Sequence, residues 1–362
     1  MLVSILIFLL VLSVLILVHE LGHFVMARRA GIWVEEFGFG LPPRLFGKKI
    51  GETIYSVNAL PFGGFVRLHG EQEEGGITDP KRAFLNKSKS VRTSVVVAGV
   101  IMNFALAVVA FAIVYSFTGI PKDTHQIKVV DISANSPAIS SGLVVGDVIN
   151  KVDGKDVTDV NSFIKNVDAK KGQKVIIETE KGKITVTPRV SPPAGEGPLG
   201  VTITSTEIYF PPVWQRPFYG IYYGFKDAFF WGRTILSGLW HMAYGLWQGD
   251  VPTDVSGPVG IFAVTTEAAK NGIITLINFV GVLSVNLAIL NILPFPALDG
   301  GRLLFIVIET IIGKKIIPKV EAIVHTIGMI ILLALILLIT VGDIRRLVIA
   351  GSIDGFLKSI VK

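Results

Sequence analysis

Residues 1–23 read MLVSILIFLLVLSVLILVHELGH, an uncharged apolar run that passes without interruption into two histidines and a glutamate. A helix needs about 20 apolar residues to cross a bilayer core about 30 Å thick, so this run is long enough to span a membrane. The stretch lacks the cationic start and the small-residue cleavage site of a signal peptide. We therefore predict a retained transmembrane helix over about residues 2–26.

Three further runs have the length and apolar character of membrane spans, at about residues 94–118, 273–293 and 322–341. The composition of the 362-residue chain agrees, because 51% of its residues are hydrophobic and only 17% are charged, against about 25% charged in an average soluble protein. A water-soluble globule could not cover so much apolar mass with so little polar surface. The sequence predicts a polytopic α-helical membrane protein with about four transmembrane helices, its membrane core divided into residues 1–120 and 271–362.

Positive charges predict how the chain is oriented in the membrane. Residues 28–92, between the first two apolar runs, contain eleven lysines and arginines. The positive-inside rule places this loop in the cytoplasm and the N-terminus outside, so we expect a multi-pass protein of a bacterial inner or cytoplasmic membrane. Arg345 and Arg346 then face outside, against the rule. The formal net charge of +6 is typical of loops that face anionic lipid headgroups, and the expected partner is the bilayer rather than a nucleic acid.

Residues 125–206 carry short β-branched runs punctuated by Gly, Asp and Asn, a pattern typical of a small β-rich domain. Within them, SPAISSGLVVGDVINKVDGKDV at 136–157 resembles the signature of PDZ domains, with Gly142, Gly146–Asp147 and Asp153–Gly154 in the expected places. The resemblance implies a groove in which an extended peptide adds a strand to a sheet edge, so a peptide or protein ligand is expected there. The orientation above makes this domain extracytoplasmic. An unrelated small β domain is the alternative.

The segment 207–270 is rich in aromatic residues. Between residues 213 and 248, Trp, Tyr and Phe are interleaved with charged side chains, too polar for a clear membrane span and too aromatic for an ordinary soluble helix. Because aromatic rings favour the headgroup level of a bilayer, we predict an amphipathic helical pair at the membrane interface. A fifth transmembrane helix is the alternative.

The motif HELGH, residues 19–23, ends the first apolar run. Residues four apart lie on the same face of a helix, so His19 and His23 can offer two imidazole nitrogens to one zinc ion. Glu20 then lies beside the metal and can act as general base on the attacking water, as in the H-E-x-x-H pattern of metalloproteases. A five-residue match can arise by chance, but ionisable residues at the end of an uncharged membrane helix are costly and are functional by default.

A catalytic zinc takes three protein ligands, and the absence of cysteine excludes a cysteine-based metal site, a thiol nucleophile and a disulfide scaffold. The candidate third ligand is Asp299, in the stretch NILPFPALDGG at residues 291–301 after the third apolar run. The first and third spans leave the membrane on the same side, so Asp299 can lie at the depth of His19 and His23. An ordinary Asp-Gly turn would explain the LDG motif at 298–300, but not the preceding Asn291, Pro294 and Pro296.

Together, HELGH in the first span, NILPFPALDGG after the third and the PDZ-like stretch between them resemble the site-2 proteases, in particular the RseP-type branch of peptidase family M50. The resemblance covers nearly the whole chain. It implies zinc-dependent cleavage of transmembrane helices, with Zn²⁺ held by His19, His23 and Asp299 and with Glu20 as the catalytic carboxylate. It also implies that Asn291 contacts the substrate backbone near the scissile bond.

The chain departs from that family pattern in two places. The RseP-type proteases carry tandem PDZ domains, whereas this sequence holds one PDZ-like stretch. The family motif GPxxNF of the second span appears here as GVIMNF at residues 99–104, with Val100 at the proline position. Asn103 in this motif is a candidate to line the site, but a contact between helices is the favoured interpretation. His325, four residues after Glu321, is interpreted as a packing residue.

Residues 53–68, in a β-prone region at about 50–70, read TIYSVNALPFGGFVRL. Two β-prone halves flank the sequence PFGG, so we predict a membrane-associated β-hairpin or re-entrant loop centred on residues 61–64, beside the active site. Gly63 and Gly64 are the candidates for offering backbone hydrogen-bonding groups to an unwound substrate strand. A cytoplasmic hairpin with no catalytic role is the alternative.

These patterns predict a zinc-dependent intramembrane endopeptidase that cuts single-span membrane proteins in regulated intramembrane proteolysis, with its active site toward the cytoplasm. The expected substrates are already shortened by a first cut, such as anti-sigma factors or signal-peptide remnants, because the PDZ domain would exclude bulky external domains. The competing hypothesis is a catalytically inactive PDZ membrane scaffold. The complete set of three ligands and Glu20 argues against that hypothesis.

Overall fold

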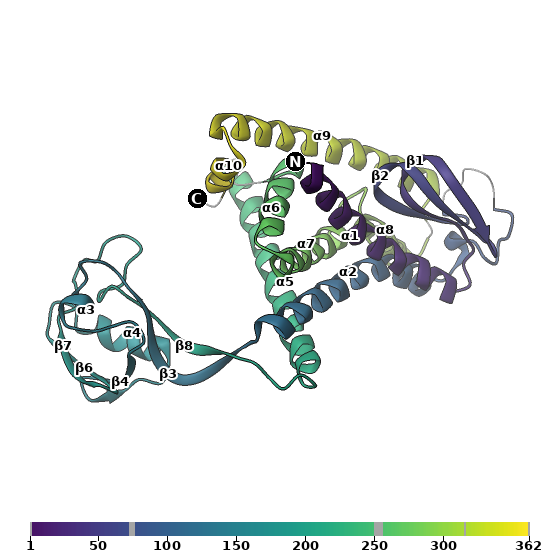
Figure 1. Cartoon of the computed structure of the whole chain (residues 1–362). Coiled ribbons are helices and arrows are strands. Elements are labelled where there is room, and N and C mark those ends of the chain that lie inside the picture. Colours follow the sequence, from purple (N-terminus) through teal and green to yellow (C-terminus); the bar gives the residue numbers. More distant parts are fainter. Residues whose placement is uncertain (1, 72–76, 250–255, 315, 361–362) are drawn as a thin grey trace. The chain divides into compact units, whose positions relative to one another are not determined.

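A computed structural model describes residues 2–71, 77–249, 256–314 and 316–360. The chain divides into two compact units, Thr118–Arg216 and a larger unit formed by Met1–Phe117 together with Pro217–Lys362 (Figure 1). The bounds of the inserted unit bracket the β-rich domain predicted at 125–206. Each unit has its own hydrophobic core.

Four helices within the described residues are long and apolar enough to cross a membrane: α1 (Leu2–Arg29), α2 (Lys89–Thr118), α7 (Ile273–Ile292) and α9 (Pro318–Ala350). They coincide with the four apolar runs, which confirms the predicted class of membrane protein. At 1.5 Å per residue, the 33 residues of α9 extend over about 50 Å, well beyond the predicted span. Exposed Leu, Ile and Val side chains cover α9, as expected for a helix that faces lipid.

Shorter helices complete the larger unit: η1 (Phe84–Asn86), α6 (Pro258–Lys270), α8 (Asp299–Ile312) and α10 (Ile353–Ile360). The start of α6 is held by Asp343 of α9, whose carboxylate accepts hydrogen bonds from the Gly257 N–H at 2.8 Å and the Gly260 N–H at 3.0 Å. A buried ion pair between Arg92 and Glu309 ties α8 to the beginning of α2. Buried polar contacts therefore anchor α6 to α9 and α8 to α2.

A long two-stranded antiparallel sheet, β1 (Val34–Ile50) and β2 (Thr53–Leu68), lies between α1 and α2 in the sequence (Figure 1). The turn between the two strands is at Gly51–Glu52, so residues 61–64, which lie inside β2, are not the turn of a simple hairpin. The other form of the prediction, a loop at 61–64, is compatible with the pairing, because 54–57 run parallel to 36–39 whereas 64–68 run antiparallel to 34–39. The partner of β2 is upstream, in a stretch whose glycines and prolines (GFGLPPR) are not typical of a strand. The predicted β structure is present, but it is one half of a larger sheet.

Both strands bend, which lets each of them pair twice. Residues 34–39 pair with 64–68 on one side and with 54–57 on the other. The bends coincide with Gly40 and Gly63, whose positive φ angles of 79° and 96° cost glycine little. The sheet is fastened to α1 by a hydrogen bond of 3.2 Å from the Ser13 hydroxyl to the carbonyl of Pro61 in β2.

The aromatic segment forms one continuous helix, α5 (Arg216–Gln248), so the prediction of a helical pair is wrong. Four small residues one turn apart, from Gly220 to Gly232, are buried. A Cβ on Gly224 would lie 2.5 Å from the Val108 carbonyl oxygen, so this stripe brings α5 into close contact with α2. Aromatic side chains such as Trp240 remain exposed. Among the described helices α5 does not qualify as a membrane span, and residues 250–255 of the predicted segment lie outside the described residues.

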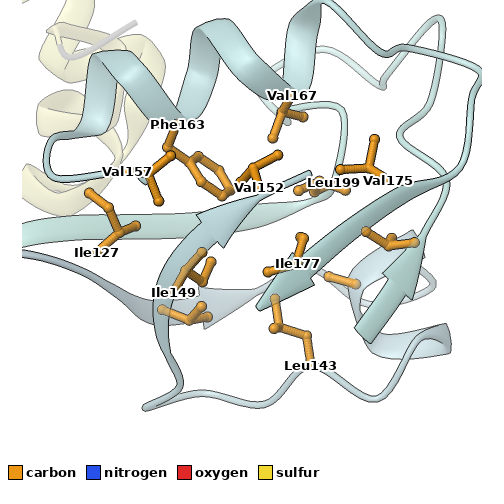
Figure 2. Close-up of a cluster of buried hydrophobic side chains, with 13 residues drawn as sticks. Ile127, Leu143, Ile149, Val152, Val157, Phe163, Val167, Val175, Ile177 and Leu199 are labelled. Carbon is orange, nitrogen blue, oxygen red and sulfur yellow. The ribbon is translucent and has the colours of Figure 1, made fainter. Parts of the chain in front are cut away.

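The inserted unit is a β-rich domain, composed of β3 (Ile120–Ile132), α3 (Pro137–Ser140), β4 (Val148–Val152), β5 (Lys155–Asp156), α4 (Val160–Asp168), β6 (Val175–Thr179), β7 (Gly182–Val186) and β8 (Val201–Tyr209). Its antiparallel strands are hydrogen-bonded in the order β7-β6-β4-β3-β8, and β5 pairs with β4. In Figure 2, Phe163 and Val167 of α4 point toward the sheet and meet core residues such as Ile127 and Val152. Gly142 and Gly146 of the quoted signature have positive φ angles of 86° and 94°, which explains why that pattern needs glycine there.

Candidate metal centre

The last turns of α1 bring His19 and His23 together on one face. Their Nε2 atoms are 3.1 Å apart, and their rings meet edge to face. Asp299, distant in the sequence, lies against both: its Oδ2 atom is 3.0 Å from His19 Nε2 and 3.2 Å from His23 Nε2. Among the described residues these three form the group whose side chains could hold a metal ion. The structure thus places together the three residues that the sequence predicts as ligands.

Asp299 reaches this position because the chain turns sharply after α7. Pro294 and Pro296 prevent the helix from continuing, and Ala297 adopts a left-handed φ of 83°. Asp299 is then the first residue of α8. A Cβ on Gly300 would lie 2.0 Å from a carbonyl oxygen of the preceding segment, so only glycine lets α8 begin this close to the end of α7.

The donor set fits a zinc ion. Zinc bonds of about 2.0–2.2 Å to nitrogen and oxygen, at tetrahedral angles, separate neighbouring ligand atoms by about 3.3 Å. The three ligand atoms here lie between 3.0 and 3.2 Å from one another. Asp299 Oδ2 is buried and, within the described part of the chain, receives no hydrogen bond of acceptable geometry despite its two imidazole neighbours. A buried anionic oxygen in this situation is suited to a cation, and three protein ligands leave a fourth position open for the reaction.

Helix α2 holds the second ring nitrogen of each histidine. His23 Nδ1 lies 2.8 Å from the Val95 carbonyl oxygen, to which it donates when Nε2 binds a metal. His19 Nδ1 lies 3.3 Å from the side-chain amide of Asn103, a fully buried residue. The Asn103 amide oxygen has no other partner among the described residues, so with the amide turned it accepts from a protonated Nδ1. Both contacts orient the imidazoles for metal binding through Nε2.

Two glycines let α1 and α2 approach each other at the histidines. A Cβ on Gly22 would lie 2.4 Å from a backbone oxygen of α2, and one on Gly99 would lie 2.5 Å from His23 Nε2. Neither position has room for a side chain. Sequence reasoning passed over Gly99 and interpreted Asn103 as a contact between helices, whereas the structure brings both to the ligands. The GVIMNF motif at 99–104 is the signal that could have identified them.

Glu20, His23 and Asp299 line a cavity of about 920 Å³ whose other walls come from α2, β2, α8 and α9. This volume is at the upper end of the range for ligand-binding clefts, about 300–1,000 Å³. A Cβ on Gly64 would lie 3.5 Å from Glu20 Cγ, so β2 passes directly beside the glutamate. The cavity therefore offers a carboxylate, the candidate metal ligands and a strand backbone in one place.

The cavity also contains an arginine that the sequence analysis did not identify. Arg302, one turn after Asp299 in α8, forms an ion pair with Glu71. The neighbouring Glu71 carboxylate raises the pKa of Arg302, so the guanidinium stays charged. Because Glu71 follows β2 closely, this pair ties the end of the sheet to the helix that carries Asp299.

The described contacts do not bring two of the predicted substrate-binding residues to Glu20. Asn291 is partly buried in the last turn of α7 and is not one of the residues that line the described cavity. Gly63 faces the side chain of Leu41, 3.4 Å from the position of a Cβ on this glycine. Of the three predicted residues, Gly64 is the one that the structure brings to Glu20.

Known relatives match almost the whole chain. The sequence profile described as Peptidase family M50 matches residues 7–335. A Clostridium perfringens protein named as a zinc metalloprotease is 39% identical, over 93% of this chain and 97% of its own. The zinc metalloprotease RasP of Geobacillus kaustophilus is 30% identical, over 95% and 98% of the two chains. The regulator of sigma-W protease RasP of Bacillus subtilis is 29% identical, over 94% and 98%.

Proposed function

The chain belongs to peptidase family M50, and from that premise we propose that it cuts the transmembrane segments of single-span membrane proteins that an earlier cleavage has shortened. It is a multi-pass membrane protein. It is also a zinc-dependent metalloendopeptidase of the site-2 protease type, related to the RasP proteases, as the motifs predicted. The observation that carries the proposal is the meeting of His19, His23 and Asp299 in a membrane unit, beside a large cavity.

We assign the roles at the site as follows. His19, His23 and Asp299 would hold the zinc ion. When bound, zinc supplies a Lewis acid that polarises the scissile carbonyl and acidifies water. Glu20 lines the same cavity and is positioned to take the proton of the attacking water and to pass it to the leaving amine. The inactive-scaffold alternative is not favoured, because the ligand set and Glu20 are complete and assembled.

A transmembrane helix must unwind before its peptide bonds can be hydrolysed, and we propose that the β1–β2 sheet accompanies the unwound strand. β2 contacts α1 at two points: the Pro61 carbonyl accepts a hydrogen bond from the Ser13 hydroxyl, and Gly64 lies beside Glu20. Residues 41–50 of β1 are exposed and include Leu45 and Phe46, at 71% and 67% exposure, which suits a sheet edge in contact with lipid. Non-helical backbone is tolerated at membrane depth where it lines a cavity or is buried in protein.

We propose that the inserted unit is a PDZ domain that binds an extended peptide. β8 is an edge strand of its sheet. A cavity of about 140 Å³ lies between α4 and the segment that leads into β8, and its apolar lining includes Phe163, Ile164, Val167, Leu199, Val201 and Ile203. An edge strand beside an apolar groove is the arrangement by which a peptide adds a strand and buries its alternate side chains.

We further propose that the zinc site faces the cytoplasm and the inserted unit faces outside. Arg28 and Arg29 end α1 shortly after His23, in a loop rich in positive charge. Such loops remain on the cytoplasmic side of bacterial membranes. An external PDZ domain would then exclude substrates whose external part is still bulky.

The test uses one single-span substrate in two forms, with its folded external domain and with that domain truncated, each reconstituted with the protease in liposomes. We expect the intact chain to cleave the truncated form much faster, and a chain lacking residues 125–206 to cleave both forms at similar rates. Equal cleavage of both forms by the intact chain would contradict the proposed substrate class, while leaving the metalloprotease assignment unaffected.

A further inference from the structure

A histidine that the mechanism above does not use also lines the zinc-site cavity. His325 of α9 accepts a hydrogen bond at its Nδ1 from the backbone N–H of Ala297, at 3.1 Å. Ala297 lies two residues before Asp299, in the turn between α7 and α8. We propose that His325 is a positioning residue that holds this turn so that the Asp299 carboxylate meets the two histidines. The inference rests on the proposed role of Asp299 as a zinc ligand.

The turn that carries Asp299 needs external support. Ala297 has a φ of 83°, a left-handed conformation that is unfavourable for a residue other than glycine. Such a conformation persists only where the surroundings impose it. Helix α9 does so at two points one turn apart: His325 binds the Ala297 N–H, and Gly328 lies so close to Pro296 that a Cβ on it would be 2.4 Å from the proline ring.

The imidazole of His325 makes one hydrogen bond within the described part of the chain, from the Ala297 N–H to Nδ1. A backbone N–H only donates, so Nδ1 must be unprotonated and a neutral ring carries its hydrogen on Nε2. Nε2 is buried and has no hydrogen-bond partner in the described part of the chain. The ring of Phe305, from α8, lies 5.7 Å from the imidazole centroid and limits its movement. The His325 ring is therefore held in the orientation that supports the turn by the bond at Nδ1 and by Phe305, and Nε2 makes no contribution to holding it.

Loss of the hydrogen bond from Ala297 to His325 should displace Asp299 and weaken zinc binding. The three ligand atoms already lie at separations suited to zinc, and metal–ligand distances vary by only about 0.2 Å. Substitution of a residue that orients a ligand typically weakens metal binding by about 10- to 100-fold. We expect a loss of this size when the turn before Asp299 is no longer held.

The experiment compares zinc dissociation constants, measured in detergent by competition with a chelator, for two variants of the full chain. His325→Leu removes the acceptor, and we expect it to bind zinc about 10- to 100-fold more weakly than the unsubstituted chain. His325→Asn keeps an acceptor near the position of Nδ1, and we expect it to restore most of the affinity. His241→Leu, at an exposed histidine of α5, is the matched control and should bind zinc normally.

Zinc affinity unchanged in His325→Leu would overturn the inference, and so would an Asn variant that loses as much affinity as the Leu variant. If His325→Leu does not fold, His325→Gln replaces it, because its longer side chain places the amide near Nε2 rather than Nδ1 and should not restore binding. Asp299→Ala separates the two proposals. If that variant keeps its zinc, the proposed ligand set fails; if it loses zinc while His325→Leu keeps it, only the role of His325 fails.

Discussion

Replacing Gly99 by alanine should disrupt the zinc site without changing any ligand. An ideal Cβ at this position lies 2.5 Å from His23 Nε2 and 2.7 Å from His19 Cε1, whereas ordinary van der Waals contacts begin at 3.4 Å. To relieve the overlap with Nε2, the imidazole or the whole of α1 must move by about 0.9 Å, the difference between the actual and the ordinary distance. Because zinc–ligand distances vary by only about 0.2 Å, this displacement is more than four times what the site tolerates.

We expect Gly99→Ala to bind zinc about 100-fold more weakly or worse, to lose cleavage in parallel, and to lose about 1–3 kcal/mol of folding stability through overpacking. Zinc per chain is measured by elemental mass spectrometry after dialysis against a graded series of chelator concentrations, and cleavage is measured on the same preparation. Gly342→Ala is the matched control, since Gly342 lies in the membrane helix α9 and a Cβ there would meet no atom within 4 Å beyond its neighbours in the chain and the backbone of its own helix. Wild-type zinc affinity in Gly99→Ala would refute the close packing of α1 and α2 at the histidines.

Three further outcomes are expected. Asn103→Leu removes the partner of a zinc-binding imidazole and should weaken zinc binding by about 10- to 100-fold in chelator competition; an unchanged affinity would argue against this contact. Gly64→Ala places a Cβ 3.1 Å from the Gly38 carbonyl oxygen, a tight contact that should shift β2 beside Glu20, whose Cγ would be 3.5 Å from the new Cβ. We expect a lower kcat with zinc content unchanged, and an unaltered kcat would argue against a role for β2 in the site. Burial acts to raise the pKa of Asp147, but the Lys181 ammonium and a backbone N–H outweigh it and lower that pKa. The stability that Asp147 contributes is therefore complete above its unfolded pKa of about 3.9 and is lost as the pH falls through its lower folded value. Hydrogen exchange of the inserted unit in the intact chain should show this loosening in acid, and Asp147→Asn should abolish it; the same acid response in both would contradict the assignment.

The parts of the structure that could be predicted depend on local signals. The membrane helices follow from apolar runs of sufficient length, because the bilayer sets that length. The spacing of His19 and His23 is one helical turn, so any helix brings them together. Asp299 is predictable for a related reason, since two prolines and an LDG motif directly after an apolar run indicate a turn at the end of a membrane span.

The parts that could not be predicted depend on contacts between distant segments. β2 pairs with a glycine- and proline-containing stretch upstream, so its own pattern suggested a hairpin around its internal bend. Asn103 meets His19 across 84 residues, and Arg302 meets Glu71 across 231. The GVIMNF motif indicates a role for Asn103 but not that His19 is its partner, and nothing in the sequence around Arg302 indicates Glu71. Both pairs form only when distant segments pack together in the folded chain.

The single helix α5 illustrates a different limit. Its aromatic and charged composition indicates an amphipathic segment. The proline within residues 216–248 is Pro217, which lies in the first turn, where proline is tolerated, so no proline marks a break inside the helix. Its small residues, from Gly220 to Gly232, were open to interpretation as flexible points. In the folded chain they form a buried stripe in which Gly220 and Gly224 pack against α2 and Gly232 packs against α7, so their role depends on the partner helices.

The central claim is that Glu20 performs proton transfer at a zinc site held by His19, His23 and Asp299. Its most direct test compares the wild-type chain with Glu20→Gln in liposomes, with a truncated single-span substrate and with zinc content read on the same samples. We predict cleavage by the wild type alone, with about one zinc per chain in both proteins. Cleavage by Glu20→Gln at the wild-type rate, with zinc still bound, would contradict the claim.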